Sequence, residues 1–365
     1  MPAHLYLPIY ILVIAAMCYI VAARYYSSPG FVYQIRNSSV LIPFMICILL
    51  TLWLGGRPIS GMFFGDTSSY AHTYEEGFIG NGSIDLRSEW FWTTLTLICK
   101  NLGFSVHLYF IVVEAIYIFS VLWAIKHFVP SNPMLGMLFV FSSLMFFTFG
   151  TNGIRNGMAC HLTALAISYF LMKRYGIAGL LMFIAFGTHR SVFLPIVSII
   201  AAKYFIKNFK TSMYIWVACI FISLLVGGTI SNMFASLDFD DRMSQYLTNR
   251  NNDSFSSTGF RWDFLIYSAP PILLGWYVIV KRQIKDEWFR ILCMAYCFAN
   301  AFWVLVIRVA FSNRFAYLSW FLYPIIVAYA VINLPIWEDQ DKKTGMILTV
   351  YCTFTVFMNL FYWSS

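Results

Sequence analysis

Five arginines stand where apolar stretches of the sequence end, and their side chains could bind a polyanion. Arg is always charged, and its planar guanidinium can donate two parallel hydrogen bonds to a phosphate or a carboxylate. Several arginines at one face would make a site for a pyrophosphate or an acidic sugar. The alternative is that each side chain only reaches the lipid headgroups beside its helix end. The five are Arg155, Arg190, Arg261, Arg308 and Arg314.

A carboxylate and a phenol follow the second apolar stretch. Asp66 lies in Gly-Asp-Thr-Ser-Ser-Tyr, so Tyr70 is one helical turn further on. Such a carboxylate could act as a general base or orient a sugar hydroxyl. The alternative is a helix cap, because Asp is a favoured N-cap residue.

His189 ends another apolar stretch and is followed directly by Arg190. An ionisable group at the end of a membrane helix is by default a candidate for function, although its ring could also simply bind a backbone carbonyl. The neighbouring positive charge favours the neutral imidazole and makes the protonated form costly. A carboxylate has no such conflict, because its protonated form is neutral. We therefore predict Asp66 as the base, Tyr70 as the group that orients the acceptor, and His189 as a donor to sugar or pyrophosphate.

The composition shows what must position these residues. Of the 365 residues, 60% are hydrophobic and only 11% are charged, against about 25% charged in soluble domains. Such a chain cannot cover a surface that faces water, so most of it must lie in lipid. A soluble enzyme, a secreted disulfide scaffold and a nucleic-acid module are excluded. The net charge of +8 is then first a topology signal.

Continuously apolar segments predict an all-α polytopic membrane protein with about twelve transmembrane helices. A membrane helix needs about 20 mostly apolar residues, and several of the middle segments are shorter than that. The segments are 5–23, 39–56, 106–125, 134–150, 157–172, 176–188, 191–206, 213–232, 262–280, 290–307, 313–332 and 345–362.

The distribution of Lys and Arg predicts the orientation. One set of alternate loops carries nine of the ten Lys, and the other set carries nine of the fourteen Arg. The Lys-rich side is typical of a cytoplasmic surface, which places both termini and the Arg-rich loops outside. Interface anchoring alone does not explain why the outer side prefers Arg to Lys.

The predicted outer side also holds two long loops, about 57–105 and 233–261. Residues 88–103 in the first are apolar on one face and too short to span comfortably, so we expect a helix lying in the membrane interface. The second loop is rich in Asp, Asn and Ser, which is typical of a flap. Glu114 is the one acidic residue well inside a span and must be paired or face a cavity. A single integral membrane domain over 1–365 accounts for the whole chain.

Four short segments, 66–74, 153–159, 186–191 and 313–317, carry motifs that resemble those of the EpsG-like, Wzy-type polymerases of bacterial surface polysaccharide. That family has an Asp…Tyr pair, an Ile-Arg-Gln-Gly-like segment, a Phe-His-x-Ser segment and a late Arg-Phe segment in this order. The chain departs from the pattern at Asn156, where Gln is more common, and at Gly65, where Arg often precedes the Asp.

This resemblance implies a GT-C-like membrane glycosyltransferase in the bacterial cytoplasmic (inner) membrane, with no cofactor, no nucleotide sugar and no metal. Its donor would be a growing glycan on undecaprenyl pyrophosphate, and its acceptor a repeat unit on the same lipid. The glycan would move to the non-reducing end of the acceptor at the outer face. The implied partners are membrane lipid, a chain-length regulator and a flippase, with no nucleic acid. Asp66 and His189 would be catalytic, and Tyr70 and the five arginines would bind substrate.

Three other functions remain open from the sequence. A polysaccharide flippase or other transporter should carry charges deep in many spans and show symmetric halves, whereas here the charges gather at one face. A membrane O-acetyltransferase also uses a His in a helical bundle but needs acyl-CoA from the cytoplasm. An O-antigen ligase differs only in its acceptor.

The topology can be tested by labelling single cysteines from outside the cell in a background without the eight native cysteines. We expect Arg250→Cys to react with an impermeant reagent and Lys207→Cys to stay unlabelled, because 233–261 is predicted outside and 203–212 inside. Labelling of position 207 but not of position 250 would reverse the orientation.

Overall fold

The computed structural model describes residues 1–27, 40–76, 89–235, 259–309 and 312–362, and every regular element in these ranges is a helix. The apolar composition explains this, because a helix satisfies all of its own backbone hydrogen bonds inside lipid. All eight cysteines are free and buried, as expected of small apolar side chains.

The described residues form two compact units, 1–190 with 327–365 and 191–326. The prediction of a single domain stays a prediction. The larger unit contains α1 (Tyr6–Ser27), α3 (Leu41–Gly55), α4 (Gly61–Phe64), α5 (Thr67–Glu76), α6 (Trp90–Asn101), α7 (Val106–Phe128), α8 (Pro133–Phe141), α9 (Phe146–Thr151), α10 (Ile154–Leu171), α11 (Tyr175–Thr188) and α19 (Gln340–Phe357). The smaller unit contains α12 (Phe193–Tyr204), α13 (Phe209–Ala235), α15 (Trp262–Gly275), α16 (Glu287–Leu305) and α17 (Asn313–Trp320), and α18 (Leu322–Asn333) begins in it and ends in the larger unit.

Helices occupy all twelve segments predicted as spans, but they differ in length. Six described helical segments are long and apolar enough to cross a membrane: Ala3–Ser27, Val106–Phe128, Phe209–Gly227, Trp262–Lys281, Glu287–Leu305 and Asn313–Asn333. Leu41–Gly55 and Tyr175–Thr188 are apolar but shorter. The chain is therefore a polytopic helical membrane protein, and twelve crossings stay a prediction.

The predicted helix over 134–150 is wrong as one continuous element, because it breaks between α8 and α9. A break exposes backbone carbonyls, which must find donors in an apolar interior. Tyr10 Oη donates to the Phe141 carbonyl at 2.6 Å and Thr355 Oγ1 to the Ser142 carbonyl at 2.7 Å. Side chains of α1 and α19 thus satisfy the break, which local sequence does not reveal.

The described part of the predicted outer loop 57–105 is largely helical, since α4, α5 and α6 lie in it. Helix α6 has 12 residues and is about 18 Å long at 1.5 Å per residue, so it is too short to span. Its position in the membrane interface stays a prediction. Most of the second predicted loop, 233–261, lies outside the described residues.

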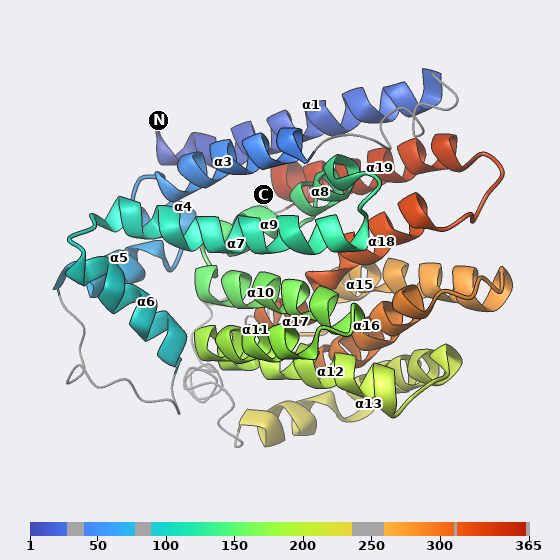
Figure 1. The fold of residues 1–365 in the computed structure, drawn as a ribbon. Coiled ribbons are helices and arrows are strands. Elements are labelled where there is room, and N and C mark those ends of the chain that lie inside the picture. The colour runs from blue at the N-terminus through green and yellow to red at the C-terminus, as the bar shows by residue number, and fades with distance from the viewer. Residues whose placement is uncertain (28–39, 77–88, 236–258, 310–311, 363–365) are drawn as a thin grey trace. The chain divides into compact units, whose positions relative to one another are not determined.

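Helix α7 lies between α3 and α10 (Figure 1). Gly55 lets the end of α3 approach it, because a Cβ at this position would lie 2.6 Å from the Ile111 Cα. This contact brings Arg57, two residues after α3, beside Glu114 of α7. The buried carboxylate that the sequence left without a partner is therefore paired with Arg57.

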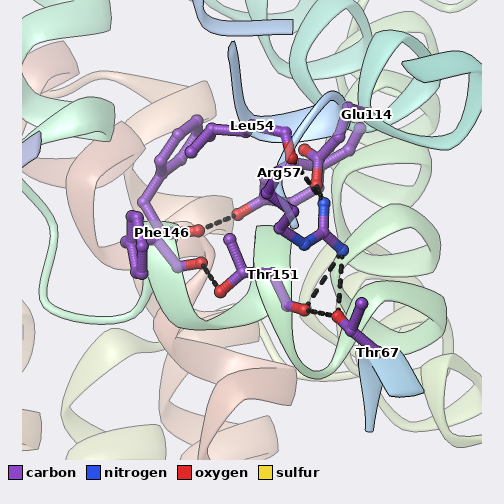
Figure 2. A network of polar contacts seen from close by, with 8 residues as sticks. Leu54, Arg57, Thr67, Glu114, Phe146 and Thr151 are labelled. Atoms are coloured by element: carbon purple, nitrogen blue, oxygen red, sulfur yellow. Dashed lines mark hydrogen bonds and ion pairs between the residues drawn. The ribbon is translucent and has the colours of Figure 1, made fainter. Parts of the chain in front are cut away.

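The Arg57 guanidinium is fully buried and contacts four groups (Figure 2). Its Nη1 donates to Glu114 Oε1 at 3.1 Å and to the Leu54 carbonyl at 2.7 Å. Its Nη2 donates to Thr67 Oγ1 and to the Thr151 carbonyl, both at 3.2 Å. One side chain thereby joins the end of α3, the middle of α7, the start of α5 and the end of α9.

Removing one charge of this pair should destabilise the protein strongly. Glu114→Leu leaves the Arg57 charge buried without its counterion, which costs about 3–5 kcal/mol. The double variant Arg57→Met with Glu114→Leu removes both charges and should unfold at a higher temperature than Glu114→Leu alone. Thermal unfolding in detergent measures both. The single variant Arg57→Met completes the comparison. If the double variant loses as much stability as Arg57→Met and Glu114→Leu lose together, the two side chains are not coupled.

Candidate functional site

The Arg57 network fixes the backbone around Asp66. Thr67 Oγ1 donates to the Thr151 carbonyl, and the Asp66 backbone N–H donates to Asn152 Oδ1 at 2.8 Å. Gly65 has a φ of +49°, and a Cβ there would lie 2.4 Å from Asn152 Oδ1. The close approach to Asn152 explains why this chain has Gly immediately before the Asp. Asp66 is half-buried at the start of α5.

Tyr70 and Arg155 meet one turn further along α5. Arg155 is the second residue of α10, and its Nε donates to Tyr70 Oη at 2.9 Å. The Arg155 Cζ also lies 5.3 Å from the centre of the Tyr70 ring. Since Asn152 holds Asp66 and Arg155 holds Tyr70, the junction between α9 and α10 orients this face of α5.

Glu89, which the sequence did not single out, joins the predicted residues. Its side chain stands directly before α6, where Oε2 pairs with Arg155 Nη1 and Oε1 with His189 Nδ1. His189 follows the last residue of α11. The side chains of Arg155, Glu89 and His189 are 22%, 21% and 19% exposed, so solvent or a ligand can reach them. We call Tyr70, Glu89, Arg155 and His189 the Glu89 cluster.

The Glu89 cluster keeps its central carboxylate ionised. Burial by itself would raise the pKa of Glu89, but the hydrogen bond and charge of His189 and the charge of Arg155 outweigh it and lower that pKa. An ionised carboxylate only accepts hydrogen bonds, so the His189 Nδ1 must carry the proton between them. The other ring nitrogen, Nε2, is then the one that can accept or deliver a proton.

Helix α6 is held against α11 by its first aromatic ring. The Trp90 indole packs on Gly187, where a Cβ would lie 2.3 Å from Trp90 Nε1, and its ring centre is 4.9 Å from that of Phe183. At the other end of α6, Lys100 Nζ donates to the Tyr74 carbonyl at 3.0 Å. These contacts fix both ends of the helix that begins beside Glu89.

The other four predicted arginines are not part of the Glu89 cluster. Arg190 is exposed in the larger unit, immediately after His189. Arg261, Arg308 and Arg314 belong to the smaller unit, so their convergence with Arg155 stays a prediction.

Within the smaller unit these arginines already have partners. Arg261 makes a fork to Asp263, with Nε–Oδ1 and Nη2–Oδ2 distances of 2.9 and 2.6 Å, and its Cζ lies 3.7 Å from the centre of the Phe264 ring. Arg308 Nε donates to the Ser223 carbonyl at 3.4 Å, and Arg314 is half-buried in the first turn of α17. Asp263 therefore competes with any anionic ligand at Arg261, as Glu89 does at Arg155.

The signal for Glu89 was present in the sequence but weak. It precedes Trp-Phe-Trp at the start of the predicted interfacial helix, and carboxylates favour helix N-termini. Such a carboxylate would ordinarily be read as a simple helix-end residue. Only the packing of α6 on α11 shows that it faces two basic side chains.

In chemical terms the Glu89 cluster offers a fixed cationic fork, a carboxylate–imidazole pair and a phenol. In the described residues no group of three or more His, Cys, Asp and Glu side chains could hold a metal ion. The absence of a metal from the reaction stays a prediction. The fold and the cluster together define a helical membrane protein in which a guanidinium, a carboxylate, an imidazole and a phenol gather at helix ends.

A comparison with known families identifies the chain. Residues 40–365 match the EpsG family, so the chain belongs to it and the predicted family is confirmed. This is a family of glycosyltransferase-like polymerases of polysaccharide biosynthesis. Searches of curated proteins and of solved structures give no match.

The packing of Trp90 on Gly187 can be tested with a matched pair of substitutions in α11. Gly179→Ala meets nothing within 4 Å and should hold or raise the unfolding temperature, because Ala is better than Gly in a helix by about 0.5–1 kcal/mol. Gly187→Ala should lower it, because overpacking costs about 1–3 kcal/mol. Thermal unfolding in detergent compares them, and equal unfolding temperatures would show that Trp90 does not pack there.

Proposed function

We propose that this protein polymerises lipid-linked oligosaccharide repeat units at the outer face of the bacterial cytoplasmic membrane. The growing glycan leaves undecaprenyl pyrophosphate and is joined to the non-reducing end of a new repeat unit on the same lipid. The observation that carries the proposal is the Glu89 cluster in a chain that belongs to the EpsG family.

The reaction needs three functions from the protein. The acceptor hydroxyl must lose its proton as its oxygen bonds to the anomeric carbon of the donor. The bond from that carbon to the pyrophosphate breaks, and the pyrophosphate leaves with the electron pair. Fixed cationic donors stabilise such a leaving group, a positioned base takes the proton, and nearby polar groups orient the sugar.

The side chains of the larger unit match these needs. Arg155 donates through a guanidinium that Tyr70 and Glu89 hold in place. Asp66 is a half-buried carboxylate immediately before the helix that carries Tyr70, and it can orient a sugar hydroxyl. The buried Trp92 ring packs with its centre 5.5 Å from that of Tyr70 and so supports the half-buried Tyr70 ring, an aromatic group of the kind on which sugar rings pack.

The remaining arginines and partners complete the proposal. Arg190, which follows His189 in the chain, would also bind substrate. Arg261, Arg308 and Arg314 would hold the pyrophosphate of the second lipid. The bundle would be GT-C-like and present apolar helix faces to the two polyprenyl chains. A flippase would supply the acceptor, and a chain-length regulator would end the reaction.

Deletion of the protein in its host, followed by electrophoresis of the surface glycan, tests the function. A polymerase predicts loss of the glycan ladder with a single repeat unit retained. Complementation with Arg155→Lys should restore protein but little ladder, because the ammonium keeps the charge and loses the fork to Tyr70 and Glu89. Arg261→Lys and Arg314→Lys test the proposed second site in the same assay.

Arg282→Lys is the matched control, since Arg282 is exposed and lies on the predicted cytoplasmic side. It should restore the ladder fully. Loss of all glycan on deletion would favour a flippase, and an intact but unacetylated ladder would favour an acetyltransferase. If Arg155→Lys, Arg261→Lys and Arg314→Lys all give normal ladders, these arginines only anchor their helices at the membrane interface.

A further inference from the structure

Glu89 contacts two basic side chains at once, and this arrangement changes which group can act as the base. Each carboxylate oxygen has its own partner, Arg155 for one and His189 for the other. The three side chains come from the ends of three helices, α6, α10 and α11. A carboxylate that only caps its own helix does not use both oxygens to contact residues of two other helices. Glu89 therefore does more than cap α6.

The contact to His189 fixes the ring. Because the Glu89 carboxylate can only accept, Nδ1 is the donor and the ring is held with Nε2 as the remaining proton site. A carboxylate that orients an imidazole in this way is the arrangement found in hydrolytic triads, where the second ring nitrogen removes a proton from a hydroxyl.

The contact also removes the objection to a histidine base. From the sequence, Arg190 makes protonated His189 costly. In the structure the ring lies against Glu89, so an imidazolium formed by proton uptake has a counterion in direct contact. Glu89 is the charged group in contact with the ring, and Arg155 contacts Glu89. Arg190 is the next residue in the chain, and the titratable Tyr70 contacts Arg155.

Given the polymerase reaction proposed above, we infer that His189 is the catalytic base and Glu89 its positioning residue. As the acceptor oxygen bonds to the anomeric carbon, its proton passes to His189 Nε2 and the pyrophosphate leaves with the electron pair. The imidazolium then returns its proton to water or to the pyrophosphate. Asp66 orients the acceptor sugar, which replaces the base role that the sequence predicted for it.

The test uses the purified full-length protein in detergent with lipid-linked repeat units isolated from the deletion host. His189→Gln should lower kcat by about 10²–10⁴-fold, the usual contribution of a positioned base, with KM changed only a few-fold. Glu89→Gln should lower kcat, and Glu89→Asp should recover part of the loss. Glu75→Gln is the control, because Glu75 is exposed on α5 and its variant should keep full activity.

The dependence of kcat on pH separates positioning from a purely structural role. Without the Glu89 carboxylate the imidazolium is less stable, so the acid limb of the profile should move to lower pH in Glu89→Gln. An acid limb at the wild-type position would overturn the role of Glu89. Full loss in Asp66→Asn with residual activity in His189→Gln would return the base to Asp66.

Two readouts keep the two proposals distinct. If the wild-type protein forms no chains from these repeat units, the polymerase function itself fails. If it forms them and the Glu89 and His189 variants match it, only the carboxylate–imidazole base fails. Thermal unfolding of each variant tests whether it is folded. A folded variant that has lost activity supports the proposed base.

Discussion

The buried ion pair between Arg57 and Glu114 is the constraint from which the site is built. A guanidinium with no exposed surface must have a counterion and hydrogen-bond partners, because water cannot reach it. It finds them on α3, α5, α7 and α9, so none of these helices can shift without exposing an unpaired charge. The same contacts fix Thr67 and Thr151. The residue after Thr151 is Asn152, whose Oδ1 accepts a hydrogen bond from the Asp66 backbone N–H. A buried charge thereby sets the position of a half-buried one.

The Glu89 cluster follows the same electrostatic rule in a different setting. Its carboxylate also lies between positively charged or proton-donating side chains, but each of its main members keeps about a fifth of its side chain exposed. The Arg57 network is fully buried and stabilises the fold, whereas the Glu89 cluster is partly exposed, so a ligand can reach it. Asn152 and Arg155, three residues apart, connect the two networks through the junction of α9 and α10.

Much of the fold could be predicted from sequence because apolar segments in lipid have one stable backbone form. Each of the twelve segments contains helix, while the break after Phe141 depends on Tyr10 and Thr355, which are distant in sequence. The partner of Glu114 was missed for the same reason. In the site, Tyr70, Arg155 and His189 were predicted and do lie together, since loops on one side of a bundle meet at one end. Glu89 was missed because its meaning depends on how α6 packs on Gly187.

The preference for Arg on the predicted outer side now has a structural cause beside the proposed chemical one. Arg57 contacts groups on four segments of chain, and Arg155 uses Nε for Tyr70 and Nη1 for Glu89. In the smaller unit Arg261 engages both oxygens of Asp263 and the face of Phe264. An ammonium carries the same charge but lacks a planar fork, so it could not hold two helices in a fixed geometry. An Arg bias in a membrane protein therefore counts as support for anion binding only at positions where the same guanidinium also stays accessible, as it does at Arg155 and Arg261, whose side chains are each 22% exposed.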